Sequence, residues 1–119
     1  MADIKTSLDQ IMNLDGVLCC SIVDSNTGMM LGSAGSGVDL EIASAGNTEV
    51  VRAKLKTMDM LGLDDHIEDI LISLGKQFHI IRPIASAPGI FIYVVLDNTK
   101  SNLALARRKT QEVEKSLQF

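Results

Sequence analysis

Two adjacent cysteines, Cys19 and Cys20, are the only thiols of the chain and the first residues that could do redox or metal chemistry. They lie in an apolar run over 17–24 that predicts a β-strand. Successive side chains of a strand point to opposite faces, so the two sulfur atoms cannot converge on one metal ion or substrate. No other cysteine completes a thiolate cluster, and His66 and His79 are isolated. We therefore interpret both thiols as buried apolar residues that face opposite layers.

A glycine-rich segment, GSAGSG over 32–37, is the second candidate site, because such loops can bind phosphate at a helix N-terminus. Its glycines match neither the dinucleotide-binding fingerprint nor a P-loop, and no Lys-Ser/Thr pair follows them. The preceding strand also belongs to a hairpin, whereas those sites need a βαβ unit. We therefore interpret this segment as a flexible turn that leads into the next helix.

The charged residues give no catalytic pattern. Glu68 and Asp69 are adjacent at the start of a predicted strand, so their carboxylates point apart and do not form an acid/base pair. The basic run over 107–109 is expected on the solvated face of a helix, with Arg108 paired to Glu112 four residues later. Because no nucleophile elbow or HExxH helix is present, the sequence predicts no catalytic residue, no cofactor and no metal site.

Composition limits the remaining classes of protein. A chain of 119 residues, 46% hydrophobic and 22% charged, predicts a single domain over 1–119 with its own core. A formal charge of −4 and an aromatic content of 3% argue against a nucleic-acid partner. No apolar leader or membrane span is evident, so we expect a cytoplasmic protein without membrane insertion.

The elements that must position these residues alternate between helix and strand. Helices are expected over 3–14, 39–61 and 100–117, and strands over 17–24, 29–33, 67–75, 77–84 and 89–97. The short SNTG turn makes the first two strands antiparallel. The last strand is apolar almost throughout, which predicts a central strand with helices on both faces of the sheet.

The long helix, with Asp39 as its expected N-cap, carries more apolar surface than one sheet requires. A polar arc consists of Glu41, Thr48, Glu49, Arg52, Lys56 and Asp59. One apolar stripe, wide enough to cover a sheet, consists of Leu40, Ala43, Val50, Val51, Leu55, Met58 and Leu61. A second stripe consists of Ile42, Gly46, Ala53 and Met60. Its small residues would let another helix approach closely, and the terminal helices are expected on the other face, so we predict a homodimer built on this helix.

Four segments together resemble the Roadblock/LC7 domain. They are LDGVLCCSIVDSNTGMMLGS (14–33), the long helix, RPIASAPGIFIYVVLD (82–97) and NLALARRKTQEVEKSL (102–117). The likeness covers nearly the whole chain in the family's order, and it is greatest to the stand-alone prokaryotic members that resemble MglB. The resemblance implies an α+β fold, α-β-β-α-β-β-β-α, in which a five-stranded antiparallel sheet has the long helix on one face and the terminal helices on the other.

The resemblance also implies a dimer interface and a function. Family members dimerise through the long helix and the neighbouring strand, here roughly 67–74. With the second stripe, this gives a predicted interface of Ile42, Gly46, Glu49, Ala53, Met60, Ile70 and Ile72. The family contains dynein light chains, scaffolds of lysosomal signalling complexes and bacterial regulators of a small Ras-like GTPase, none known as an enzyme acting alone. We therefore expect a non-catalytic, homodimeric adaptor or regulator of a small Ras-like GTPase.

Two alternatives remain open. A sheet with hairpins and flanking helices also suits a PAS-like or profilin-like module that binds a small ligand or peptide, with the six methionines and the GSAGSG segment lining a pocket. That function predicts an internal cavity, whereas an adaptor predicts a packed core and an exposed dimer surface. A structural adaptor of the dynein-light-chain type differs from the GTPase regulator only in its partner.

Overall fold

The computed structural model describes residues 2–118, which form three helices and five strands. The elements are α1 (Ile4–Met12), β1 (Val17–Asp24), β2 (Met29–Gly35), α2 (Leu40–Met60), β3 (Ile70–Ser73), β4 (Gln77–Pro83), β5 (Ile90–Asp97) and α3 (Leu103–Ser116). This order confirms the predicted α-β-β-α-β-β-β-α arrangement. No helix within the described residues is both long enough and apolar enough to cross a membrane.

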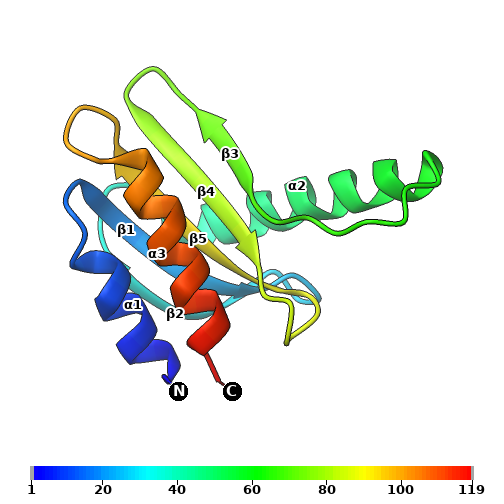
Figure 1. The fold of residues 1–119 in the computed structure, drawn as a ribbon, viewed down its shortest axis with the longest axis horizontal. Coiled ribbons are helices and arrows are strands. Elements are labelled where there is room, and N and C mark those ends of the chain that lie inside the picture. The colour runs from blue at the N-terminus through cyan, green and yellow to red at the C-terminus, as the bar shows by residue number, and fades with distance from the viewer. Residues whose placement is uncertain (1, 119) are drawn as a thin grey trace.

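The five strands form one antiparallel sheet in the order β2-β1-β5-β4-β3 (Figure 1). β5 lies at the centre, and its residues from Phe91 to Leu96 are all buried, as the apolar sequence of this strand predicted. β2 and β3 are the two edge strands. An edge strand has one row of backbone hydrogen-bonding groups without a neighbouring strand, so both edges can pair with another chain.

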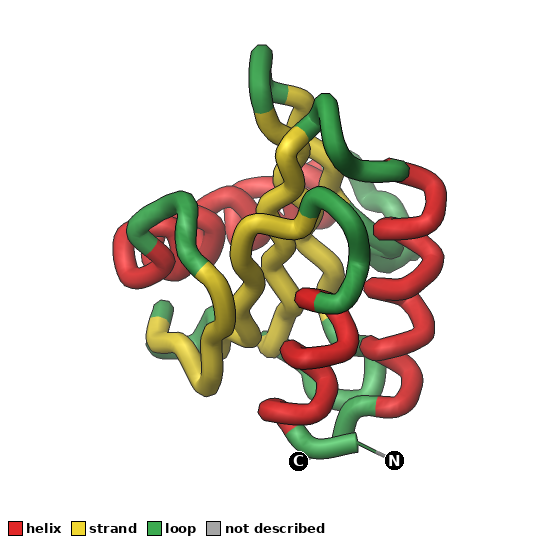
Figure 2. Tube along the Cα trace, turned by 90° about the vertical axis from the view of Figure 1, so that its left-hand side faces the viewer, coloured by secondary structure: helices red, strands yellow, loops and turns green. Residues whose placement is uncertain are grey.

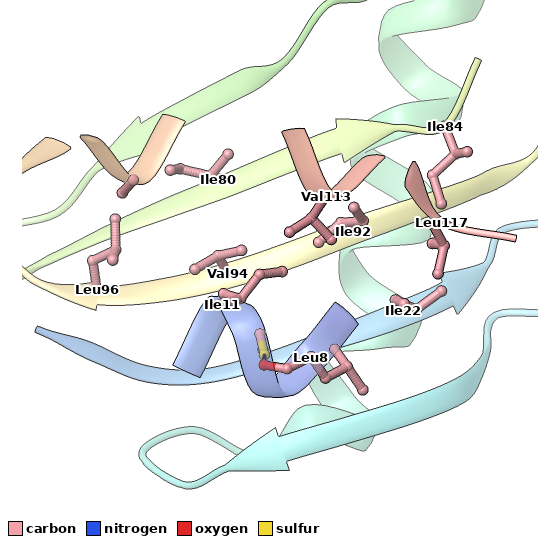
Figure 3. Close-up of a cluster of buried hydrophobic side chains, with 12 residues drawn as sticks. Leu8, Ile11, Ile22, Ile80, Ile84, Ile92, Val94, Leu96, Val113 and Leu117 are labelled. Atoms are coloured by element: carbon pink, nitrogen blue, oxygen red, sulfur yellow. Dashed lines mark hydrogen bonds between the residues drawn. The ribbon is translucent and has the colours of Figure 1, made fainter. Parts of the chain in front are cut away.

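Helices cover the two faces unequally. Figure 2 shows α2 on one side of the sheet and the other two helices on the opposite side. Leu8 and Ile11 of α1, with Val113 and Leu117 at the end of the chain, pack over β1, β4 and β5 in the larger hydrophobic cluster (Figure 3). The smaller cluster lies under α2 and includes Val51. Fewer buried hydrophobic residues therefore lie in the cluster under α2 than in the cluster under α1 and α3.

Cys19 and Cys20 lie on opposite faces, which confirms their predicted placement. Cys19 belongs to the cluster under α2, and Cys20 belongs to the cluster under α1 and α3. The Cys20 thiol donates a weak hydrogen bond to the carbonyl oxygen of Leu8, at 3.7 Å. Burial raises the pKa of Cys20 to about 12 and also raises the pKa of Cys19. Both groups are therefore protonated thiols at neutral pH, and thiols are poor nucleophiles and poor metal ligands.

The GSAGSG segment is mostly strand, so the prediction of a flexible turn is wrong for its first four residues. Gly32–Gly35 belong to β2 and pair with β1. A side chain at Gly32 would place a Cβ 2.6 Å from the Cγ2 atom of Ile4, so glycine allows α1 to pack directly on this edge. The chain turns only after Gly35, and α2 begins at the predicted N-cap, where Asp39 accepts hydrogen bonds from the backbone amides of Glu41 and Ile42.

Candidate interaction surface

The first half of α2 lies on the sheet through two hydroxyl side chains and one valine. Ser44, Thr48 and Val51 are buried. The Ser44 hydroxyl donates to the carbonyl of Leu40 at 2.6 Å, and the Thr48 hydroxyl donates to the carbonyl of Ser44 at 2.8 Å. Because these bonds satisfy the hydroxyls within the helix, both side chains can face the core. The prediction that Thr48 lies on the solvated arc is therefore wrong.

Arg52 fixes the middle of α2 to the hairpin of β1 and β2. Its guanidinium donates to the carbonyl oxygens of Ser25 and Asn26, at 2.5 and 3.3 Å. The same group forms an ion pair with Glu49, one turn earlier, at 3.5 Å. This attachment sets the direction in which the rest of the helix leaves the sheet.

The second half of α2 projects beyond the sheet (Figure 1). Every residue over 52–57 is exposed, and of 52–60 only Met58 is buried. Leu55 is 49% exposed and Leu61 is 65% exposed, although both were predicted to cover the sheet. A helix of 21 residues is about 31 Å long. It packs mainly against β1 and β2 near its start, so its far end extends past the sheet edge.

The second stripe of α2 is uncovered by its own chain. Ile42 is 70% exposed, Met60 is 76% exposed, and Gly46, Glu49 and Ala53 are also exposed. A Cβ placed on Gly46 would meet no atom within 4 Å. The structure thus places the five helical residues of the predicted interface along solvent, separate from the buried side of the helix.

Ile70 and Ile72 of β3 face the same side of the sheet as α2. Ile70 pairs with Ile81 of β4, which belongs to the cluster under α2, and Ile72 pairs with His79. Both isoleucines are only half-buried, because α2 does not pack over this edge of the sheet. We call the seven residues Ile42, Gly46, Glu49, Ala53, Met60, Ile70 and Ile72 the α2–β3 surface.

A short polar chain crosses the sheet beside this surface. The Tyr93 hydroxyl lies 2.9 Å from His79 Nδ1, and His79 Nε2 lies 2.8 Å from the Gln77 side-chain oxygen. The two rings meet edge to face, with centroids 5.5 Å apart. Burial lowers the pKa of His79 and raises the pKa of Tyr93. The sequence alone shows His79 as isolated, because its cross-strand neighbours depend on the register of β4 and β5.

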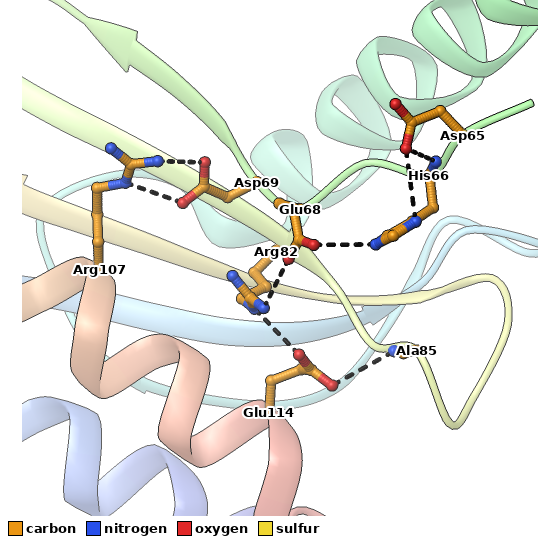
Figure 4. Close-up of polar contacts among 8 residues, drawn as sticks. All are labelled: Asp65, His66, Glu68, Asp69, Arg82, Ala85, Arg107 and Glu114. Carbon is orange, nitrogen blue, oxygen red and sulfur yellow. Dashed lines mark hydrogen bonds and ion pairs between the residues drawn. The ribbon is translucent and has the colours of Figure 1, made fainter. Parts of the chain in front are cut away.

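Glu68 and Asp69 point to different basic partners, as predicted, although they lie before β3 and not on a strand (Figure 4). Asp69 accepts two hydrogen bonds from Arg107, at 2.8 and 2.9 Å, which raises the pKa of that guanidinium. Glu68 pairs with the buried Arg82 at 3.3 Å, and Glu114 binds the same guanidinium at 3.1 Å. These carboxylates therefore join β4 and α3 to the segment before β3.

The predicted pair between Arg108 and Glu112 is not among the ion pairs formed within residues 2–118. Lys109 approaches Glu112 instead, at 3.9 Å. Another residue of the same basic run, Arg107, pairs across the molecule with Asp69. Sequence spacing detects contacts within a helix but cannot detect a partner 38 residues away.

A groove of about 640 Å³ lies where β4 ends and β5 begins. Val51, Leu55, Pro83 and Phe91 contribute apolar surface, and the cluster around Arg82 lies beside them. The groove is open to solvent, whereas the ligand-binding alternative predicted an internal cavity. Within the part of the chain that the structure describes, no three His, Cys, Asp or Glu side chains are arranged to hold a metal ion.

Comparison with known proteins identifies the fold. No protein-family model and no curated protein matches the sequence. A Roadblock/LC7 domain from Streptomyces avermitilis superimposes with a TM-score of 0.81 at 10% identity, over 97% of this chain and 94% of that one. MglB from Myxococcus xanthus gives a TM-score of 0.80 at 19% identity, over 94% and 89% of the two chains.

A third solved structure, described as MglB with tetrameric arrangement, gives a TM-score of 0.81 at 12% identity, over 95% of this chain and 83% of that one. These three matches cover between 94% and 97% of this chain. The likeness inferred from the sequence is thereby confirmed at the level of structure. The chain has the Roadblock/LC7 fold.

Proposed function

We propose that this protein is a non-catalytic, homodimeric adaptor of the cytoplasm that regulates a small Ras-like GTPase through protein contacts. The observation that carries this proposal is the projecting α2, whose second stripe is exposed along its whole length. Ile42 and Met60, large apolar side chains near the two ends of α2, are both open to water on this stripe. Burial of one side chain such as Ile42 or Met60 contributes about 1.5 to 3 kcal/mol, so a partner that covers the stripe is strongly favoured.

A second copy of the chain is the partner that fits best. An isologous dimer pairs a surface with itself, and the small residues Gly46 and Ala53 let two α2 helices approach closely. The adjacent β3 is an edge strand with free backbone groups, and the same contact in a second copy can satisfy them. The α2–β3 surface therefore combines a helix and a strand edge on one side of the molecule.

A dimer of this kind presents a broad composite surface across its two-fold axis. Such a surface can hold the switch regions of a GTPase in one state without providing a catalytic group. The Roadblock/LC7 fold and the likeness to MglB support this choice of partner, because the family contains bacterial regulators of a small Ras-like GTPase. A purely structural adaptor would use the same surface with another partner.

The proposal is tested with the GTPase whose gene lies nearest to the gene of this protein. We expect the purified GTPase to bind the wild-type protein in at least one nucleotide state and to change its rate of GTP hydrolysis. Ala53→Glu places a charge in the centre of the α2–β3 surface and should abolish the effect. Ala104→Glu makes the same change at an exposed position of α3 and should leave the effect intact.

Absence of a complex in every nucleotide state would contradict the GTPase part of this proposal. An equal effect of wild type and Ala53→Glu on hydrolysis would contradict the role of the dimer.

A further inference from the structure

His79 lies beside the α2–β3 surface with apolar residues on both sides. His79 belongs to β4, and its side chain lies on the same side of the sheet as α2. Its direct cross-strand neighbours are Ile72 of β3 and Val95 of β5. Its ring is half-buried in the single chain, because α2 does not pack over this edge of the sheet. A second copy that covers Ile72 would therefore also remove water from the open side of the His79 ring.

The hydrogen bonds of His79 fit the neutral ring. Gln77 presents its side-chain oxygen to Nε2, so Nε2 carries the proton and donates it. Nδ1 then has a free electron pair and accepts from the Tyr93 hydroxyl. Burial raises the pKa of Tyr93, and the side chain of Asn47 in α2 lowers it. The chain Tyr93, His79 and Gln77 thus runs from donor to acceptor in one direction.

A second proton on the ring disrupts this chain. Protonated Nδ1 becomes a donor, so the hydroxyl hydrogen of Tyr93 loses its acceptor. The groups next to the ring carry no negative charge that could compensate for a second proton. Ile72 of β3 and Val95 of β5 are its cross-strand neighbours, and Tyr93 and Gln77 are its hydrogen-bond partners. Near Tyr93, the Asn47 side chain of α2 is uncharged, and burial keeps the Cys19 thiol protonated. Within residues 2–118, His79 takes part in no ion pair.

We propose that His79 makes the homodimer sensitive to pH, such that proton uptake by this ring weakens the contact between the two copies. This inference rests on the proposed α2–β3 dimer. Covering the ring disfavours its charged form further, so the dimer binds protons less tightly than the free chain. By linkage, the dimer is strongest when both rings are neutral and is lost as the pH falls through the pKa of His79 in the free chain.

Sedimentation equilibrium at constant ionic strength, between about pH 4.5 and pH 7.5, tests the proposal, because burial lowers the pKa of His79 below the ordinary value of histidine. Each dimer contains two His79 rings, so we expect the dissociation constant to rise at least about tenfold on acidification. His79→Gln removes the titrating group and should abolish the pH dependence. The chain contains one other histidine, His66, which is exposed, and His66→Gln should leave the pH dependence unchanged.

A second measurement does not depend on the folding of the His79 variant. Ring NMR signals of His79, followed against pH, should show a lower pKa in the wild-type dimer than in the Ala53→Glu chain. A wild-type dimer with the same affinity across this pH range would overturn the role of His79 and leave the dimer intact. Loss of the pH dependence in His66→Gln instead would also overturn it. A wild-type chain that stays monomeric throughout would contradict the proposed dimer itself.

Discussion

Cys20 lies fully buried beneath α1, and its thiol donates to the carbonyl oxygen of Leu8. Cys19 is equally buried on the other side of the strand, under α2. A thiol whose pKa is raised by burial is a small apolar side chain in practice. The adjacent cysteines therefore show that β1 is buried on both of its faces.

Replacing both Cys19 and Cys20 with Ala should leave metal content and dimer affinity unchanged. The expected loss of unfolding free energy is about 1 kcal/mol per site, because each substitution removes one buried sulfur atom and leaves a small cavity. Urea unfolding and elemental analysis measure these two quantities. A metal ion bound to the purified wild-type protein, or a disulfide between the two residues, would show that the thiols have a chemical role.

Glu114→Ala should be far more damaging than its position near the end of the chain suggests. The substitution leaves the buried Arg82 guanidinium with the exposed Glu68 as its remaining carboxylate partner. Removing one partner of a buried ion pair costs about 3 to 5 kcal/mol. Glu112→Ala, two residues earlier on the solvated side of α3, is the matched control and should change the unfolding free energy by less than about 0.5 kcal/mol. Similar midpoints for the two variants in urea would contradict this role of Glu114.

At the scale of the elements, α2 has two halves with different surroundings. Its first half packs on the sheet through Ser44, Thr48 and Val51, and its second half projects beyond the sheet edge after Arg52 is fixed to the β1–β2 hairpin. An exposed helix this long gains most of its stability in proteins from packing of an apolar face. Apart from Met58, the projecting half lacks such packing within the single chain, which supports the proposal that α2 contacts a partner.

Gly46→Ala separates the stability of the helix from that of the dimer. The added methyl meets nothing within 4 Å in the single chain, and alanine is the better helix former by about 1 kcal/mol, so thermal unfolding of a monomeric background should shift upward. The same methyl should weaken dimerisation, because it prevents the close approach of two helices at this position. Combining Gly46→Ala with Ala53→Glu provides the monomeric background. Unchanged dimer affinity in the single variant would place the helix contact elsewhere.

Local patterns in the sequence predicted most of the elements and fewer of the contacts. Alternating and continuous apolar runs predicted β1 and β5 closely, and the N-cap Asp39 predicted the start of α2, because these signals depend on neighbouring residues. Thr48 was misplaced because an intrahelical hydrogen bond lets a hydroxyl face the core. The projection of α2, the Arg82 cluster and the polar chain through His79 could not be predicted, since each depends on how distant segments meet.

At the scale of the whole molecule, the two faces of the sheet have different roles. The face under α1 and α3 is closed by the larger hydrophobic cluster, and the charged residues of α3 fasten the segment that leads into β3. The face under α2 is only partly covered, and the α2–β3 surface lies at its open edge. One face thus stabilises the fold while the other is available for association. The proposed adaptor function agrees with this division, because it would depend on the surface that the protein presents.

The most direct test of this account is the sedimentation of wild type, Ala53→Glu and Ala104→Glu at neutral pH and micromolar concentration. We expect a wild-type dimer, a folded monomer for Ala53→Glu and a dimer for Ala104→Glu, with circular dichroism confirming that all three are folded. A monomeric wild type, or an Ala53→Glu variant that dimerises with unchanged affinity, would contradict the claim that the protein functions as a dimer through the α2–β3 surface.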